Sequence, residues 1–330
     1  MKAKYAASLC LLLLCAIPIS ADDGNASISA GGVVVMGRET RIVMAKEVLE
    51  ISIDRVVVDY DFRNDSDEDV TTTVAFPVPD YQYDPNAPPI RWEGFDDFRL
   101  WVYGEPISFQ IEARAFVKGR EATKLLKQSG VDIASFGRAS DEYGPAPDVM
   151  RLQAVKRKAL QNAGAIDEDG IPQWVVRKKY YWQQKFPAHD TVHIRHTYTP
   201  VEGAENSIKY GMRTGSTDAS SANELKSFCI DGGLQRTLQA FADSKDMDAP
   251  YAYVDFILTT ANSWKTPIED FTLRVHRQPK SSDHETNFVS FCWDGPVKKI
   301  DADTFEVTAK SFVPRKELRV VFFQVQKSQF

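Results

Sequence analysis

Acidic and aromatic side chains gather between positions 92 and 101. This stretch holds Trp92, Glu93, Asp96, Asp97 and Trp101. Paired carboxylates can act as acid and base in glycoside cleavage, and flat rings offer a sugar an apolar stacking surface. Glu93, Asp96 and Asp97 are therefore candidate catalytic residues, and Trp92 and Trp101 are candidate binding residues. Because Asp96 and Asp97 would diverge on a strand, a loop that closes one end of a β-sandwich is the favoured interpretation.

Two histidines, His193 and His196, have a spacing that would place them on one face of a helix, where they could bind zinc. The alternating pattern of residues 191–198 instead predicts a strand. On a strand, His196 shares the inner face with Val192 and Ile194, and His193 points outward. We therefore expect no zinc site here, and we expect His196 to be a core residue with a hydrogen-bond partner.

The usual catalytic and nucleotide-binding motifs are missing from the chain. It contains no G-x-S-x-G, H-E-x-x-H, Walker-type or G-x-G-x-x-G pattern. We predict no metal and no cofactor, and the sequence favours a non-catalytic protein.

The first 21 residues have the pattern of a secretory signal peptide. Lys2 and Lys4 precede an apolar run over residues 6–17, and small residues end at Ala21. That run is shorter than the roughly 20 residues that a membrane-spanning helix needs. We therefore predict an exported protein, periplasmic or extracellular, with no transmembrane anchor in the mature chain.

Four cysteines are present, but Cys10 and Cys15 lie in the predicted signal peptide. Two thiols that remain in an exported protein favour a disulfide bond between Cys229 and Cys292. The alternative is a free Cys229 that acts as a nucleophile, which would require a nearby histidine.

The net charge is −6 for the whole chain and −8 once Lys2 and Lys4 are removed. Nucleic-acid binding usually needs a basic surface, so a nucleic-acid partner is not expected. The mature chain has the composition of a globular protein, and its length suggests two domains.

Alternating residues predict strands over much of the chain. Residues 56–62 and 70–76 form two such runs, and the acidic segment 64–69 between them predicts a β-hairpin with a solvated turn. A calcium loop is the alternative, but the EF-hand spacing is missing. A second strand pair is predicted over residues 98–103 and 107–111.

Helix-forming residues are concentrated between about residues 115 and 164, where Asp148 is a candidate N-cap and Gly164 a candidate C-terminal residue. One further helix is predicted from Asp231 to Phe241. The predicted fold class is thus mainly β, with two β-sandwich-like units and a helical insertion in the first. The predicted divisions are residues 1–21 (signal peptide), 22–203 (first unit, insertion at about 115–164) and 204–330 (smaller unit with one disulfide).

Several passages resemble one bacterial family, in order along the chain. They are RVVVDYDFRNDSDEDVTTTVAFPVPD at 55–80, YYWQQKFPAHDTVHIRHTYTPVEG at 180–203, FCID at 228–231, LTTANSWKTPIEDFTLRV at 258–275 and SFCWDG at 290–295. The chain resembles the exported family known only as domain of unknown function 4424. The resemblance implies export and both cysteines in place, and it supplies no catalytic or binding residues.

Residues 62–65 and 76–80 also resemble part of the amino-terminal module of inter-alpha-trypsin-inhibitor heavy chains and vault proteins. That module is a β-sandwich used for protein association, so this similarity mildly favours binding. The sequence therefore predicts a non-catalytic binding or envelope-associated protein, whose partner is another envelope protein or a glycan. The alternative is an exported hydrolase that acts on glycans or another envelope polymer.

Overall fold

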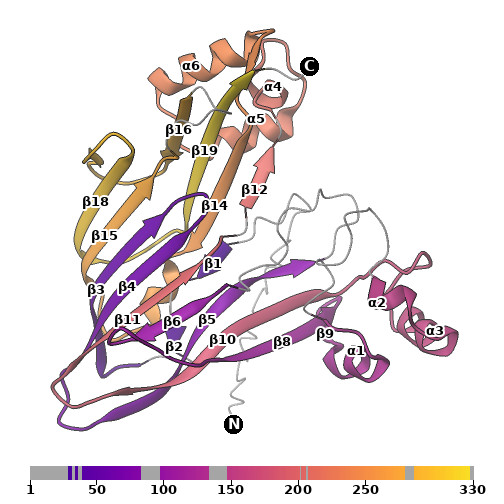
Figure 1. Ribbon diagram of the computed structural model, residues 1–330, viewed down its shortest axis with the longest axis vertical. Coiled ribbons are helices and arrows are strands. Elements are labelled where there is room, and N and C mark those ends of the chain that lie inside the picture. The colour runs from indigo at the N-terminus through magenta and orange to yellow at the C-terminus, as the bar shows by residue number, and fades with distance from the viewer. Residues whose placement is uncertain are drawn as a thin grey trace, which may run out of the picture.

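The fold is mainly β, as the sequence predicts. The computed structural model describes residues 29–31, 34–35, 39–82, 97–133, 147–200, 202–205, 207–278 and 286–327 (Figure 1). Over these residues the strands form three sheets.

The largest sheet has eight strands and runs across the molecule. In spatial order they are β17 (Lys298–Lys299), β18 (Thr304–Phe312), β15 (Ile268–His276), β3 (Ile42–Ile51), β4 (Val56–Asn64), β11 (Thr191–Tyr198), β6 (Arg99–Val102) and β7 (Glu105–Pro106). Only the pairing of β15 with β3 is parallel within this sheet.

A second sheet has five strands, in the order β2 (Val34–Val35), β5 (Val70–Gln82), β10 (Val175–Phe186), β8 (Gln110–Val117) and β9 (Arg120–Glu121). The third has six: β1 (Ser29–Gly31), β14 (Tyr251–Ile257), β19 (Leu318–Lys327) and β13 (Met247–Asp248) in order, with β12 (Glu202–Glu205) on β14 and β16 (Thr286–Phe291) on β19.

Helices cover two places on these sheets. Helices α1 (Thr123–Ser129), α2 (Pro147–Met150) and α3 (Ala154–Asn162) lie beyond β8 and β9 (Figure 1). Helices α4 (Lys209–Met212), α5 (Ala219–Lys226) and α6 (Gly232–Asp243) lie beside β14, β16 and β19, and the 3-10 helix η1 (Thr259–Ser263) follows β14.

One continuous apolar core joins the three sheets. Alternate residues of β4 and β11, such as Val58 and Ile194, meet Phe76 of β5 and Val254 of β14 in this core. The opposite face of β14 and β19 packs in a smaller core against α5 and α6, where Phe228 and Leu238 are buried. Because both faces of β14 are covered, six consecutive residues of this strand are buried rather than alternate ones.

The predicted hairpin over residues 56–76 is wrong, although both strands exist. Strand β4 pairs with β3 and β11, whereas β5 pairs with β10 and β2, so the acidic segment connects two different sheets. The buried side chain of Asn64 holds this connection. Its Nδ2 donates to Glu68 O (2.8 Å) and to Phe186 O (2.9 Å), and its Oδ1 accepts from Ser66 N (3.0 Å) and Ser66 Oγ (2.7 Å).

The second predicted strand pair forms only at its turn end. Strand β6 makes a short hairpin with β7, and Ile107 N donates to Leu100 O at 3.0 Å. Strand β8, which begins at Gln110, instead belongs to the five-stranded sheet, so residues 98–103 and 107–111 do not pair with each other along their length. Tyr103 and Gly104 form the two-residue turn between β6 and β7, with positive φ angles of 54° and 83°.

The helix predictions are confirmed in outline. The segment from Asp148 forms two helices, α2 and α3, rather than one, and the N-cap of α3 is Gln153 instead of Asp148. Gly164 has a φ of 67°, as expected after a helix end. Asp231 caps α6 by accepting hydrogen bonds from Gly233 N and Leu234 N. Helices α4 and α5 occupy a segment for which no helix was predicted.

The expected boundary at residue 203 stays a prediction. Strands β15 and β18 come after it in the sequence, yet β15 hydrogen-bonds to β3 in the eight-stranded sheet. The apolar core likewise contains residues from both sides of the boundary, such as Val58 and Val320.

Candidate functional site

The outer face of the eight-stranded sheet carries several groups of charged side chains that form ion pairs across neighbouring strands. Strand alternation separates the two faces: Val58, Tyr60 and Phe62 are buried, while Asp59 and Asp61 point away from the core. The same alternation on β11 buries Ile194 and His196 and turns His193 and Arg195 outward. The sequence pattern predicted this outward position for His193.

Cross-strand pairing brings these outward residues together. His193 lies opposite Asp61, and Arg195 lies opposite Asp59. His193 Nδ1 is 2.9 Å from Asp61 Oδ1, and its Nε2 is 3.3 Å from Asp59 Oδ1. Arg195 Nη1 lies 3.3 Å from Asp59 Oδ2. We call these four residues the β4–β11 cluster.

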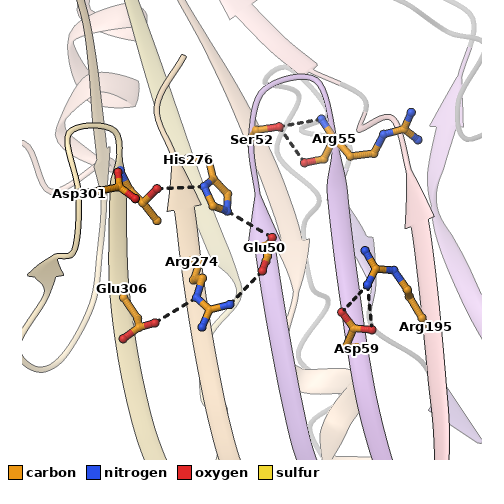
Figure 2. A network of polar contacts seen from close by, with 10 residues as sticks. Glu50, Ser52, Arg55, Asp59, Arg195, Arg274, His276, Asp301 and Glu306 are labelled. Atoms are coloured by element: carbon orange, nitrogen blue, oxygen red, sulfur yellow. Dashed lines mark hydrogen bonds and ion pairs between the residues drawn. The ribbon is translucent and has the colours of Figure 1, made fainter. Parts of the chain in front are cut away.

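A second group, the Arg274 network, consists of Glu50, Arg274, His276 and Glu306 from β3, β15 and β18 (Figure 2). Arg274 bridges two carboxylates, with Nη1 3.1 Å from Glu50 Oε1 and Nε 3.0 Å from Glu306 Oε2. His276 Nε2 is 3.4 Å from Glu50 Oε2. The hydrogen bond to Glu306, with that to Glu50, outweighs burial and raises the pKa of the Arg274 guanidinium.

Further ion pairs extend the same face toward the β4–β5 connection. Arg63 binds Glu269 with two nitrogen–oxygen distances of 2.9 Å. The hydrogen bonds from Arg63 hold the pKa of the Glu269 carboxyl below its usual range. Lys310 pairs with Asp270 on the neighbouring strands. Carboxylates that are held by cations remain charged at neutral pH and are poorly suited to donate a proton.

Two aromatic residues border this face. Trp101 of β6 lies opposite Arg195 and is half-buried. Tyr103 in the adjoining turn is 55% exposed, and its hydroxyl lies 3.1 Å from Asp190 Oδ2. Trp101, a predicted binding residue, therefore lies next to the β4–β11 cluster.

Asp97, a predicted catalytic candidate, is held by structural contacts. Its carboxylate accepts hydrogen bonds from Thr199 N and Oγ1, both at 2.8 Å, and pairs with Arg55 Nη1 at 2.7 Å. Burial raises the pKa of this carboxyl. The hydrogen bonds from Thr199 and the charge of Arg55 lower the pKa by more than burial raises it, so the net shift is downward. Asp97 thus ties β6 to the end of β11 and to the β3–β4 turn.

The remaining predicted residues of that stretch, Trp92, Glu93 and Asp96, lie outside the described residues. Asp97 is bound to Thr199 and Arg55, whereas Trp101 lies opposite Arg195, so these two candidates have different neighbours.

His196 is a core residue, as predicted, but the expected hydrogen-bond partner is not found. Its ring contacts Tyr60, Phe76 and Phe98 at centroid distances of 5.0–5.5 Å. Neither ring nitrogen has a partner within the described part of the chain. Burial lowers the pKa of His196 to about 3, so the imidazole is neutral at physiological pH.

A second buried titratable group, Glu47 of β3, was missed by the sequence analysis. It lies on the inner face with Leu49 and Ile51, and only 2% of its surface is exposed. Burial raises the pKa of its carboxyl to about 8. The alternation of residues 47, 49 and 51 could have placed this glutamate in the core, because its position is otherwise apolar.

Cys229 and Cys292 form a disulfide bond with a Cα–Cα distance of 5.1 Å. The bond joins the α5–α6 connection to the end of β16. The alternative of a free, nucleophilic Cys229 is therefore wrong for this structure.

The part of the chain that the structure describes contains no group of three or more histidine, cysteine, aspartate or glutamate residues arranged to hold a metal ion. None of the helices described has the length and apolar character required to cross a membrane.

Comparisons with known proteins give a family match. The family model described as domain of unknown function (DUF4424) matches residues 21–321. No curated protein matches the chain at a significant level.

Among solved structures, one similar chain is described as a "putative nutrient binding protein" from Legionella pneumophila. It is 14% identical, the alignment covers 89% of this chain and 70% of that one, and the TM-score is 0.42.

Proposed function

We propose that this chain, which belongs to the DUF4424 family, is an exported, non-catalytic binding protein whose outer eight-stranded sheet face contacts its partner. The match of the family model confirms the resemblance to this family that the sequence indicated. One observation carries the proposal: charged side chains from strands far apart in the sequence are fixed side by side on this face (Figure 2).

Fixed charges of both signs suit recognition better than chemistry. Strand pairing sets the spacing of the β4–β11 cluster, so little side-chain freedom remains to be lost on binding. Alternating charges favour a partner with complementary charges of both signs and disfavour a uniformly charged polymer. We therefore favour a protein partner, which can present charges of both signs, and Trp101 at the border adds an aromatic contact.

The hydrolase alternative needs a carboxylic acid with a raised pKa beside a second carboxylate. Asp97 does not meet this requirement, because its pKa is lowered and its oxygens are occupied. Glu93 and Asp96 are the remaining candidates of this alternative.

One assay separates the two functions. The chain from Asp22 onward is incubated with isolated bacterial envelope from which detergent has removed the lipid, and both bound protein and released soluble fragments are measured. Retention without fragment release supports binding. Release of sugar or peptide fragments that is lost in Glu93→Gln or Asp96→Asn would instead support the hydrolase.

Variants assign the retention to the outer face. We expect the double variant Arg195→Ala/Arg274→Ala to bind at least five-fold more weakly, as for arginines at the centre of an interface. The matched control is Arg114→Ala/Arg177→Ala on the five-stranded sheet, whose arginines also form ion pairs at 2.9 Å. If both double variants lose binding to the envelope equally, the outer face of the eight-stranded sheet is not the binding surface.

Export is a separate part of the proposal, supported by the signal-like segment and by the disulfide bond. When the full chain is expressed in a bacterium, the mass of the product should correspond to a start at Asp22. Recovery of only the intact chain in the cytoplasm would contradict it.

A further inference from the structure

We propose that helices α1, α2 and α3, with the adjoining β8–β9 turn, form a docking surface for an anionic phospholipid membrane. This surface lies at the right of Figure 1, whereas β15 and β18 of the eight-stranded sheet lie at the left. The inference does not rest on the function proposed for the sheet face.

Charge is the first reason. Residues 114–133 and 147–163 contain nine lysine or arginine residues and three aspartate or glutamate residues, a net charge of +6. The whole chain has a net charge of −6. Positive charge is thus concentrated in one protruding part of an acidic protein, which is the pattern that an anionic surface attracts.

The second reason is that these cations are available. Six of them are exposed and have no ion-pair partner among the described residues: Lys118, Arg120, Lys124, Lys127, Arg151 and Lys158. By contrast, arginines on the outer sheet face, such as Arg63, Arg195 and Arg274, are paired with carboxylates. We call the six residues, with Met150 and Val155, the basic helical surface.

Exposed apolar side chains favour lipid over an acidic protein or nucleic acid. Val155 on α3 is 78% exposed, and Met150 on α2 is 49% exposed. Val155, Lys158 and Ala159 lie on one side of α3, opposite the buried Leu160. Apolar side chains beside lysines are typical of segments that lie in a membrane interface.

An open groove of about 370 Å³ adjoins these residues. Its lining combines apolar residues with two cations and one carboxylate: Val117, Ala122, Leu125, Ala163, Arg120, Lys124 and Glu121, together with Gln128. This combination suits a lipid, because the cations can contact the phosphate of the headgroup while the apolar lining contacts its hydrocarbon part.

The test is co-sedimentation of the chain from Asp22 onward with vesicles of phosphatidylcholine, with or without phosphatidylglycerol. We expect binding only to vesicles that contain phosphatidylglycerol, and we expect it to weaken with salt. The triple variant Lys124→Glu/Lys127→Glu/Lys158→Glu should bind about a hundred-fold more weakly, since each cation near an anionic surface contributes about five-fold. The residues are exposed, and circular dichroism checks that the variant folds.

Two controls make the result specific. Lys226→Glu/Lys245→Glu/Lys298→Glu changes the net charge equally, at exposed lysines elsewhere, and should keep nearly full binding. Val155→Ser leaves the charge unchanged and should weaken vesicle binding several-fold, because it removes apolar contact. Absence of binding to either vesicle at low salt would overturn the proposal, as would equal losses in the two triple variants. If Val155→Ser has no effect and a polyglutamate peptide competes fully, the surface binds acidic polymers and the lipid assignment is wrong.

Discussion

Replacing the buried Glu47 by glutamine should stabilise the protein in alkaline solution. The pKa of Glu47 is raised by burial from 4.5 to about 8. Below pH 4.5 the carboxyl is protonated in both the folded and the unfolded chain. Between pH 4.5 and 8 only the unfolded chain loses this proton, so the free energy of unfolding falls as pH rises.

The magnitude follows from the difference between the two pKa values. Each unit corresponds to about 1.4 kcal/mol, so ionisation of Glu47 costs the folded state about 5 kcal/mol above pH 8. Glutamine cannot ionise. The difference in unfolding free energy between Glu47→Gln and the parent should therefore grow by about 5 kcal/mol between pH 4 and pH 9, whatever constant offset the amide introduces.

Urea denaturation at a series of pH values, followed by tryptophan fluorescence, measures this difference. Glu50→Gln is the matched control, because Glu50 lies on the same strand but on the outer face, paired with Arg274. It controls for the loss of one carboxyl group. A difference between Glu47→Gln and the parent that stays constant from pH 4 to pH 9 would refute the assignment of Glu47 as a buried, neutral acid.

Three further variants test other parts of the fold. Asn64→Ala removes four hydrogen bonds of a fully buried side chain and should lower the unfolding free energy by about 3 kcal/mol; Asn262→Ala, which removes one, should cost less than half as much. Arg319→Met leaves the buried Asp255 without its partner at 2.7 Å and should cost about 3 kcal/mol by thermal or urea unfolding, whereas an unchanged stability would show that the pair adds nothing. His196→Leu should become more stable relative to the parent as pH falls from 6.5 to about 3, because burial lowers the pKa of His196 to about 3 and the unfolded parent then gains a proton that the folded parent does not; a difference in unfolding free energy that stays constant over this range would contradict this.

The sequence predicted correctly which face of a strand each residue occupies. Period-two alternation placed His196 in the core and His193 outside it, and the structure agrees. Alternation is a local property, since successive side chains of any strand point to opposite sides. The residues of the β4–β11 cluster could thus be identified individually as outward-facing.

The partner of each strand could not be predicted in the same way. The runs at β4 and β5 look like a hairpin, because they are short, alternating and joined by turn residues. The side chain of Asn64 instead satisfies backbone groups of both connections between the sheets, which lets β4 and β5 separate. Helix α5 was missed for a related reason: its Ser and Asn content predicts a loop, yet Asp218 caps it through Ser220 N and Ser221 N.

Glu47 and His196 make opposing contributions to the pH dependence of stability. Between pH 4.5 and 6.5 the folded chain holds the Glu47 proton, while the unfolded chain holds the His196 proton. Each state then binds one proton at these two sites, so their effects on the slope of stability against pH cancel. Of these two sites, only His196 lowers stability below this range, and only Glu47 lowers it above the range, until about pH 8. Their joint contribution is therefore level from pH 4.5 to 6.5. In Glu47→Gln only His196 remains, so the contribution rises up to pH 6.5 and is level above it; in His196→Leu only Glu47 remains, so it is level below pH 4.5 and falls from there to about pH 8. If the two sites are independent, the changes in unfolding free energy of the single variants add up to that of the double variant at every pH, and a departure from this sum would mean that the sites are coupled through the core.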